Sequence, residues 1–170
     1  ILLLNPLYGE GYNTIKLILN GQASAVFSNS QFLSDFSDPW VIVTFAFLVL
    51  LLKPFATGFT IGAGGNGGIF APSLFIGGIT GFVFASINNL LDIGKTLSIS
   101  NFTLVGMCGV MSGVLHAPLT AIFLIAEITS GYTLFLPLML VSAVAFSTNS
   151  YFQKHSFYTA KLIESGDLIP

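Results

Sequence analysis

Residues 58–74 read Gly58-Phe-Thr-Ile-Gly-Ala-Gly-Gly-Asn-Gly-Gly-Ile-Phe-Ala-Pro72-Ser-Leu74 and contain six glycines between positions 58 and 68. Each glycine costs a helix about 1 kcal/mol relative to alanine. We therefore expect the glycine run to be a flexible backbone loop and not the interior of a membrane helix. Proline is tolerated in the first turn of a helix, because its missing N–H would have no helical partner there. The stretch predicts a loop that leads into a new helix, with Pro72 in its first turn.

The start of that helix is the most informative candidate site in the sequence. The first N–H groups of a helix, here including those of Ile69 and Phe70, have no acceptor within the helix. Together with the positive end of the helix dipole, they form a site for an anion. A phosphate-binding loop would add a Lys-Ser/Thr pair, which this stretch lacks. A motif that only packs helices would not need the proline, and Gly77-xxx-Gly81 and Gly109-xxx-Gly113 are more typical of such packing.

The composition indicates an integral membrane protein. Of the 170 residues, 54% are hydrophobic and 7% are charged, with a mean hydropathy of +0.88, whereas a soluble domain carries about 25% charged residues. All five cationic residues are lysines, and the net charge of −2 excludes a nucleic-acid-binding surface. The single cysteine, Cys108, excludes an internal disulfide framework and a cysteine-cluster metal site. Between Pro54 and Leu91 the sequence contains no Asp, Glu, Lys or Arg.

We expect an all-α membrane protein with short, tilted and re-entrant helices, as in one half of an inverted-repeat transporter. A membrane-spanning helix needs about 20 apolar residues, and only the segment 69–91 is comfortably long enough. Lys53-Pro54 interrupts the preceding segment near its end, and His116-Ala117-Pro118 divides a later one. The expected helices are 14–20, 40–57, 69–91, 101–116, 118–130, 133–150 and 157–165.

Three motifs resemble the ClC family of voltage-gated chloride channels and chloride–proton antiporters. Gly68-Ile-Phe-Ala-Pro72 matches the family's G-x-F-x-P motif. Leu115–Ala121, followed by Glu127-Ile-Thr129, is similar to its R-A-P-L-T-A…E-x-T segment, and Ser156–Leu162 is similar to its final S-I-Y-T-x-x-L helix. The resemblance implies that residues 1–170 are the C-terminal half of the ClC transmembrane domain. Residues 163–170 would begin a linker toward a cytoplasmic regulatory domain, if one follows.

The resemblance also implies a chloride site. The backbone N–H groups of Ile69 and Phe70 would bind a central chloride ion beside Gly68, and the Tyr158 hydroxyl would donate to the same ion. The residues that would shape the pore loop and the helix start are Gly67, Ala71 and Pro72. Two further pore motifs of the family, G-S-G-I-P and G-R-E-G-P, are not in this chain. The resemblance therefore implies a missing N-terminal half of the same polypeptide.

The expected function is transport of chloride, or a similar monovalent anion, across the cell membrane by a channel or a proton-coupled antiporter. The resemblance implies a homodimer in the lipid bilayer, with the helices after Pro118 and Thr133 at the dimer face. It implies no cofactor, no metal and no enzymatic activity. Two alternatives remain: another secondary transporter for a small anion with a glycine-rich broken helix, and a non-transporting membrane interaction module.

A few polar residues have a structural interpretation beside a functional one. Glu127 is either a proton relay or a helix-end acid, and its place near the end of a short helix favours the second. Ser112 and His116 share a helix face at i, i+4, but no acid is placed to orient the histidine, which argues against a serine hydrolase. Asn66 and His116 both depart from the family's pattern, the first beside the pore loop and the second at a helix end.

Overall fold

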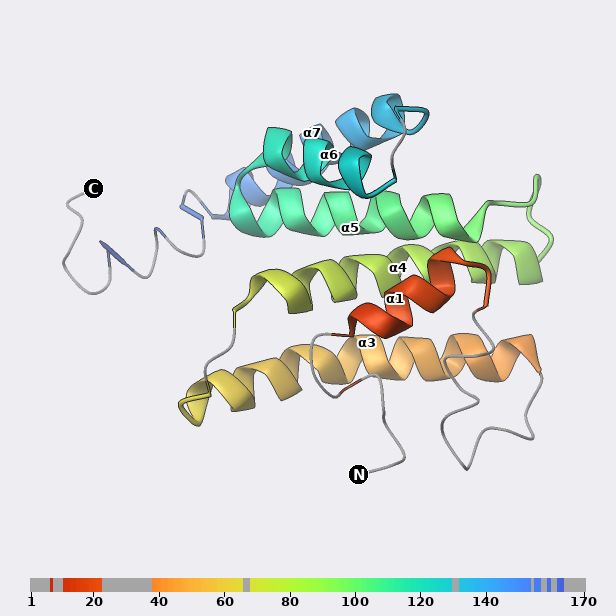
Figure 1. The fold of residues 1–170 in the computed structure, drawn as a ribbon, viewed down its shortest axis with the longest axis horizontal. Helices are drawn as coiled ribbons and strands as arrows, with labels where there is room; N and C mark the ends of the chain where they lie inside the picture. Colours follow the sequence, from red (N-terminus) through yellow and green to blue (C-terminus); the bar gives the residue numbers. More distant parts are fainter. Residues whose placement is uncertain are drawn as a thin grey trace.

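The computed structural model describes residues 7, 11–22, 38–65, 68–129, 132–153, 155, 156, 159, 162 and 163, which form helices and no strand. The helices are α1 (Tyr12–Leu19), α3 (Pro39–Gly62), α4 (Phe70–Leu90), α5 (Ile99–Leu115), α6 (Pro118–Ile128) and α7 (Phe135–Phe152). Figure 1 shows α3, α4 and α5 as successive layers, with α6 and α7 beyond α5 and the short α1 lying against α4. The predicted all-α fold is confirmed.

Three of these helices are long and apolar enough to cross a membrane: α3, α4 and α7. The expectation that only the segment 69–91 is long enough is therefore wrong. The difference arises mainly in α3, a continuous helix of 24 residues that contains Pro54. Pro54 removes one backbone donor, but a helix in an apolar setting keeps its other hydrogen bonds because no water competes for them. The hydroxyl of Thr57 also donates to the Lys53 carbonyl at 2.9 Å.

The loop within the glycine run is shorter than the sequence predicts. Gly58 and Gly62 lie within α3, so the loop interpretation is wrong for residues 58–62. The chain turns only after Gly62, where Gly64 adopts a φ of +83° that favours glycine. The Gly65 N–H donates back to the Thr60 carbonyl at 2.9 Å, which closes the end of α3.

The other helix bounds differ from expectation by a few residues. The α5 helix starts at Ile99 instead of 101, since the Ser98 hydroxyl accepts a capping hydrogen bond from the Asn101 N–H at 3.5 Å. It ends before His116, whose φ of +54° is incompatible with a further helical turn. Most of the predicted helix 157–165, and the predicted linker after Ile163, lie outside the described residues.

Small residues set the helix spacing, as the sequence predicts. A Cβ on Gly77 would lie 2.5 Å from the Gly106 carbonyl oxygen on α5, and one on Gly81 would overlap the Phe102 carbonyl. Gly109 faces α7, and a Cβ on Gly109 would lie 2.8 Å from Val141 Cγ1. The α4 and α5 backbones are therefore in direct contact. Gly106, the partner of Gly77 on α5, belongs to neither predicted packing motif.

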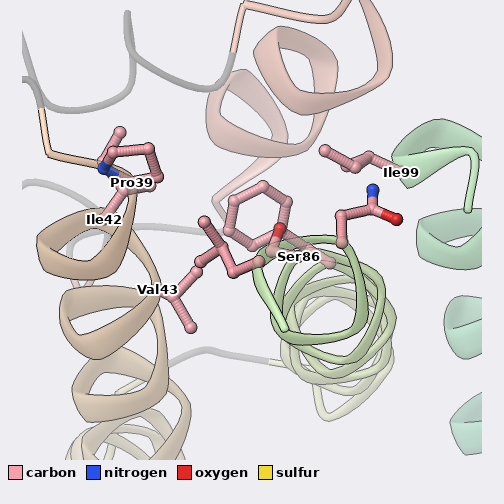
Figure 2. A pocket seen from close by; sticks show the side chains of 8 residues that line it. Pro39, Ile42, Val43, Ser86 and Ile99 are labelled. Atoms are coloured by element: carbon pink, nitrogen blue, oxygen red, sulfur yellow. The ribbon is translucent and has the colours of Figure 1, made fainter. Parts of the chain in front are cut away.

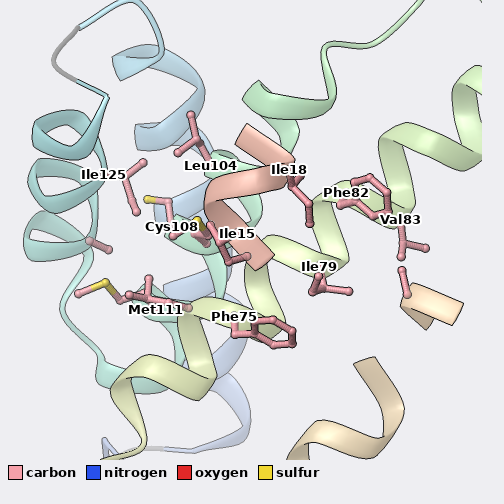
Figure 3. Packing of buried hydrophobic residues seen from close by; sticks show 14 of the residues in the cluster. Ile15, Ile18, Phe75, Ile79, Phe82, Val83, Leu104, Cys108, Met111 and Ile125 are labelled. Carbon is pink, nitrogen blue, oxygen red and sulfur yellow. The ribbon is translucent and has the colours of Figure 1, made fainter. Parts of the chain in front are cut away.

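The buried core centres on α4 and α5, and α1, α3, α6 and α7 each contribute buried residues to it. Figure 3 shows Ile15 and Ile18 of α1 against Phe75, Ile79 and Phe82 of α4, with residues of α5 and α6 on the other side. This packing holds α4 on more than one face, so the start of α4 has a fixed place in the fold.

Candidate functional site

The start of α4 has the geometry that the sequence predicts. Ile69 is the N-cap residue and makes no side-chain capping hydrogen bond, and α4 begins at Phe70 with Pro72 in its first turn. The N–H groups of Ile69, Phe70 and Ala71 precede the first helical hydrogen bond, which the Ser73 N–H donates to the Ile69 carbonyl at 3.0 Å. The first turn of α4, residues 70–73, therefore presents backbone donors and carries no charged side chain of its own.

The donors lie at the edge of the buried core. Gly68 is exposed, Ile69 and Phe70 are half-buried, and Ala71 is buried with 8% of its surface accessible. The Phe70 side chain packs against the hydrophobic core. The structure thus brings Gly68, Ile69, Phe70, Ala71 and Pro72 together at one helix end. Gly67 and Tyr158, the other two predicted site residues, lie outside the described residues.

A buried lysine near this helix end was not assigned a role from the sequence. Lys53 lies within α3 and is 2% exposed. Its Nζ donates to the Leu7 carbonyl at 3.2 Å and lies 4.8 Å from the centroid of the Phe75 ring on α4. The same ring is close to Gly11, whose φ is +79°, and a Cβ on Gly11 would overlap the ring. Lys53 therefore joins α3, α4 and the segment before α1.

The position of Lys53 in the sequence could have indicated this role. It is the last charged residue before the uncharged stretch that begins at Pro54, and a charge within a membrane helix is rarely without function.

Ser112 and His116 do not form a catalytic pair, since each contacts α7. The Ser112 hydroxyl lies 3.0 Å from the Ser142 carbonyl and 2.9 Å from the Ser142 hydroxyl. His116 Nε2 lies 3.2 Å from the Gln153 carbonyl at the end of α7. Both residues therefore connect α5 to α7, which agrees with the helix-end role predicted for His116.

Glu127 is exposed and lies one residue before the end of α6. This position agrees with a helix-end acid. Within the described part of the chain, no group of three His, Cys, Asp or Glu side chains could hold a metal ion.

One apolar pocket lies away from the candidate site. It has a volume of about 190 Å³ and is lined by Pro39, Ile42, Val43, Phe82, Ser86, Asn89, Leu90 and Ile99. Figure 2 shows Ile42 and Val43 of α3 opposite Ser86 of α4. The lining residues of α4 belong to its C-terminal half, whereas the backbone donors are at its N-terminus. The pocket and the helix start are therefore separate features.

Comparison with known proteins identifies the family. Residues 1–150 match the voltage-gated chloride channel family. The chain belongs to this family. Together with the three candidate membrane spans, this identifies a multi-pass integral membrane protein of the ClC family. The start of α4 carries the G-x-F-x-P motif through which the sequence resembles that family.

Several curated relatives share part of the chain. A ClcB-like protein of Ralstonia nicotianae is 34% identical over 129 residues, which are 76% of this chain and 30% of that protein. The H(+)/Cl(-) exchange transporter ClcA of Vibrio campbellii is 37% identical over 81 residues, 48% of this chain and 17% of the transporter. Chloride channel protein CLC-e of Arabidopsis thaliana is 36% identical over 100 residues, which cover 54% of this chain and 14% of that protein. The matched segments span less than a third of each relative.

Proposed function

We propose that this chain supplies the C-terminal half of a ClC-type anion pore. The pore would move chloride, or a similar monovalent anion, across the cell membrane, either passively or in exchange for protons. The observation that carries the proposal is the start of α4, where backbone N–H groups without a capping side chain stand at the end of an apolar membrane helix. Membership of the voltage-gated chloride channel family supports the same function.

The chemistry of the helix start suits transport better than permanent binding. An anion that leaves water needs donors, but a full positive charge in direct contact would hold it too tightly for rapid exchange. The partial charges of the Ile69 and Phe70 N–H groups and of the helix dipole stabilise the anion more moderately. A Cβ added to Gly68 would meet no described atom within 4 Å, and the glycine has no side chain that would keep an ion from this part of the backbone.

The remaining parts of the pore are proposed to come from other segments. Tyr158 would donate its hydroxyl to the same chloride ion, while Gly67, Ala71 and Pro72 would shape the loop and the helix start. The other pore elements would belong to a longer polypeptide, since the curated relatives are more than three times as long as the segments they share with this chain.

We also propose that the protein is a homodimer within the lipid bilayer. Large apolar side chains are exposed along α6 and α7, among them Leu119, Phe123, Leu136, Leu140 and Val144. Two copies that meet through these helices would cover part of this apolar surface.

The location of a bound halide tests the site directly. Crystals of the full-length polypeptide soaked in bromide are expected to show an anomalous peak within hydrogen-bond reach of the Ile69 and Phe70 nitrogens. A central peak more than about 4 Å from both nitrogens lies outside such reach, even for a large halide, and would refute the proposed site.

A further inference from the structure

Ser73 makes two hydrogen bonds to one oxygen atom at the start of α4. Its side chain is buried, with 6% of the residue exposed. The hydroxyl donates to the Ile69 carbonyl at 2.8 Å, and the Ser73 N–H donates to the same oxygen at 3.0 Å. Within the described residues, the carbonyl of the N-cap residue is therefore held from two directions.

The Ile69 carbonyl belongs to the same peptide unit as the Phe70 N–H. Because a peptide unit is planar, fixing the direction of the carbonyl also fixes the direction of the N–H on its other side. Hydrogen bonds in a chain also polarise one another, so two donors on the oxygen make the Phe70 N–H a stronger donor. Both effects act on a donor that the proposed function assigns to the anion.

A hydroxyl in the interior of the same helix makes the same type of bond without this consequence. Thr80, on the same helix, donates to the Ile76 carbonyl at 2.8 Å. The N–H of that peptide unit belongs to Gly77, inside α4, where the helix already supplies an acceptor. The position of Ser73 at the helix start therefore distinguishes its bond from the back-bond of Thr80 in the helix interior.

We infer that Ser73 is a positioning residue for the anion site, which orients and polarises the Phe70 N–H through the Ile69 carbonyl. The inference rests on the proposed function, because it takes the Phe70 N–H as an anion donor. Ser73 itself does not contact the anion, since its hydroxyl proton is used by the carbonyl.

Chloride titration of the full-length polypeptide in detergent tests this role. Ser73→Ala is expected to raise the chloride Kd about two- to tenfold, the effect of losing one neutral hydrogen bond. Ser73→Thr keeps the hydroxyl and the i−4 bond, so it is expected to keep the parental Kd. Thr80→Val removes the corresponding bond at Ile76 and serves as the matched control, with an unchanged Kd.

The melting temperature separates positioning from a general structural role. Alanine is the strongest helix former, so Ser73→Ala is expected to leave the melting temperature unchanged or to raise it while weakening binding. A loss of affinity that accompanies an equal loss of stability, and that Ser73→Thr does not restore, would overturn the inference. If Ser73→Ala does not fold, Ser73→Cys replaces it. Its thiol is a weaker donor, so an intermediate Kd is expected and a parental Kd overturns the inference.

Ile69→Pro, which removes a proposed anion donor, tells the two proposals apart. If Ile69→Pro abolishes binding and Ser73→Ala does not change it, only the role of Ser73 is refuted. If the parent does not bind chloride, or Ile69→Pro binds it normally, the proposed function and the role of Ser73 both fall.

Discussion

At the scale of the residue, the proposed anion donors belong to the backbone and not to side chains. Ile69 and Phe70 carry apolar side chains, and Phe70 directs its ring into the core. What the site requires of position 69 is an N–H in the correct direction. On this proposal, side-chain identity at position 69 affects packing, whereas the presence of the N–H decides binding.

The effect of an Ile69 substitution on the chloride Kd is therefore expected to depend on whether the new residue keeps the backbone N–H. Ile69→Leu keeps the N–H and a similar volume, so the chloride Kd should change less than about twofold, since such swaps perturb packing only slightly. Ile69→Pro removes the N–H and forces Gly68 toward extended geometry, so binding should be lost. Calorimetric titration of chloride into the full-length polypeptide measures both. Equal binding by the two variants would show that the Ile69 N–H is not a donor.

At the scale of the element, the contact of α4 with α5 fixes where the anion donors stand. Gly77 and Gly81 bring α4 against the α5 backbone at Gly106 and Phe102. Elsewhere on α4, Lys53 and Gly11 both lie close to the Phe75 ring. A shift of α4 along either contact would move the Phe70 N–H, so the site depends on packing well away from the donors.

Alanine substitutions at two helical glycines should have opposite effects. Gly81→Ala places a Cβ against the Phe102 carbonyl and should destabilise the protein by about 1–3 kcal/mol. Gly58→Ala, in the interior of α3, meets nothing within 4 Å and should stabilise it by about 0.5–1 kcal/mol. Thermal unfolding in detergent, monitored by circular dichroism, compares the two. A stabilising Gly81→Ala would contradict direct backbone contact between α4 and α5.

Sequence reasoning located the helix start but not the end of the preceding helix. Gly68 to Pro72 are contiguous, so local rules for helix starts suffice to predict their arrangement. The end of α3 at Gly62 was missed because those rules describe helices in water, where Pro54 and Gly58 would weaken the helix. The hydrogen bond of the Ser73 hydroxyl depends on a side-chain rotamer, and the Lys53–Phe75 contact depends on how α3 and α4 meet. Residue spacing alone determines neither.

At the scale of the whole molecule, the half-pore proposal makes the described helices one side of the ion site. The α4 start supplies donors at a single point, while an ion that crosses the hydrocarbon core needs donors or water along its path. Gly68 is exposed and Ile69 is only half-buried in this chain. A chloride ion at these N–H groups would therefore still be partly exposed in the described part of the chain, and the proposal assigns the rest of its enclosure to other pore elements.

The last prediction concerns transport by residues 1–170 alone. Reconstituted in chloride-loaded liposomes, this chain is expected to give no chloride efflux above that of empty vesicles, because one set of backbone donors does not make a continuous path. The full-length polypeptide at equal molar amount should release chloride. A chloride electrode follows both, and circular dichroism of the same vesicles establishes that the short chain is helical. Anion-selective efflux from residues 1–170 that Ile69→Pro abolishes would mean that this chain forms a complete pore, against the half-pore proposal.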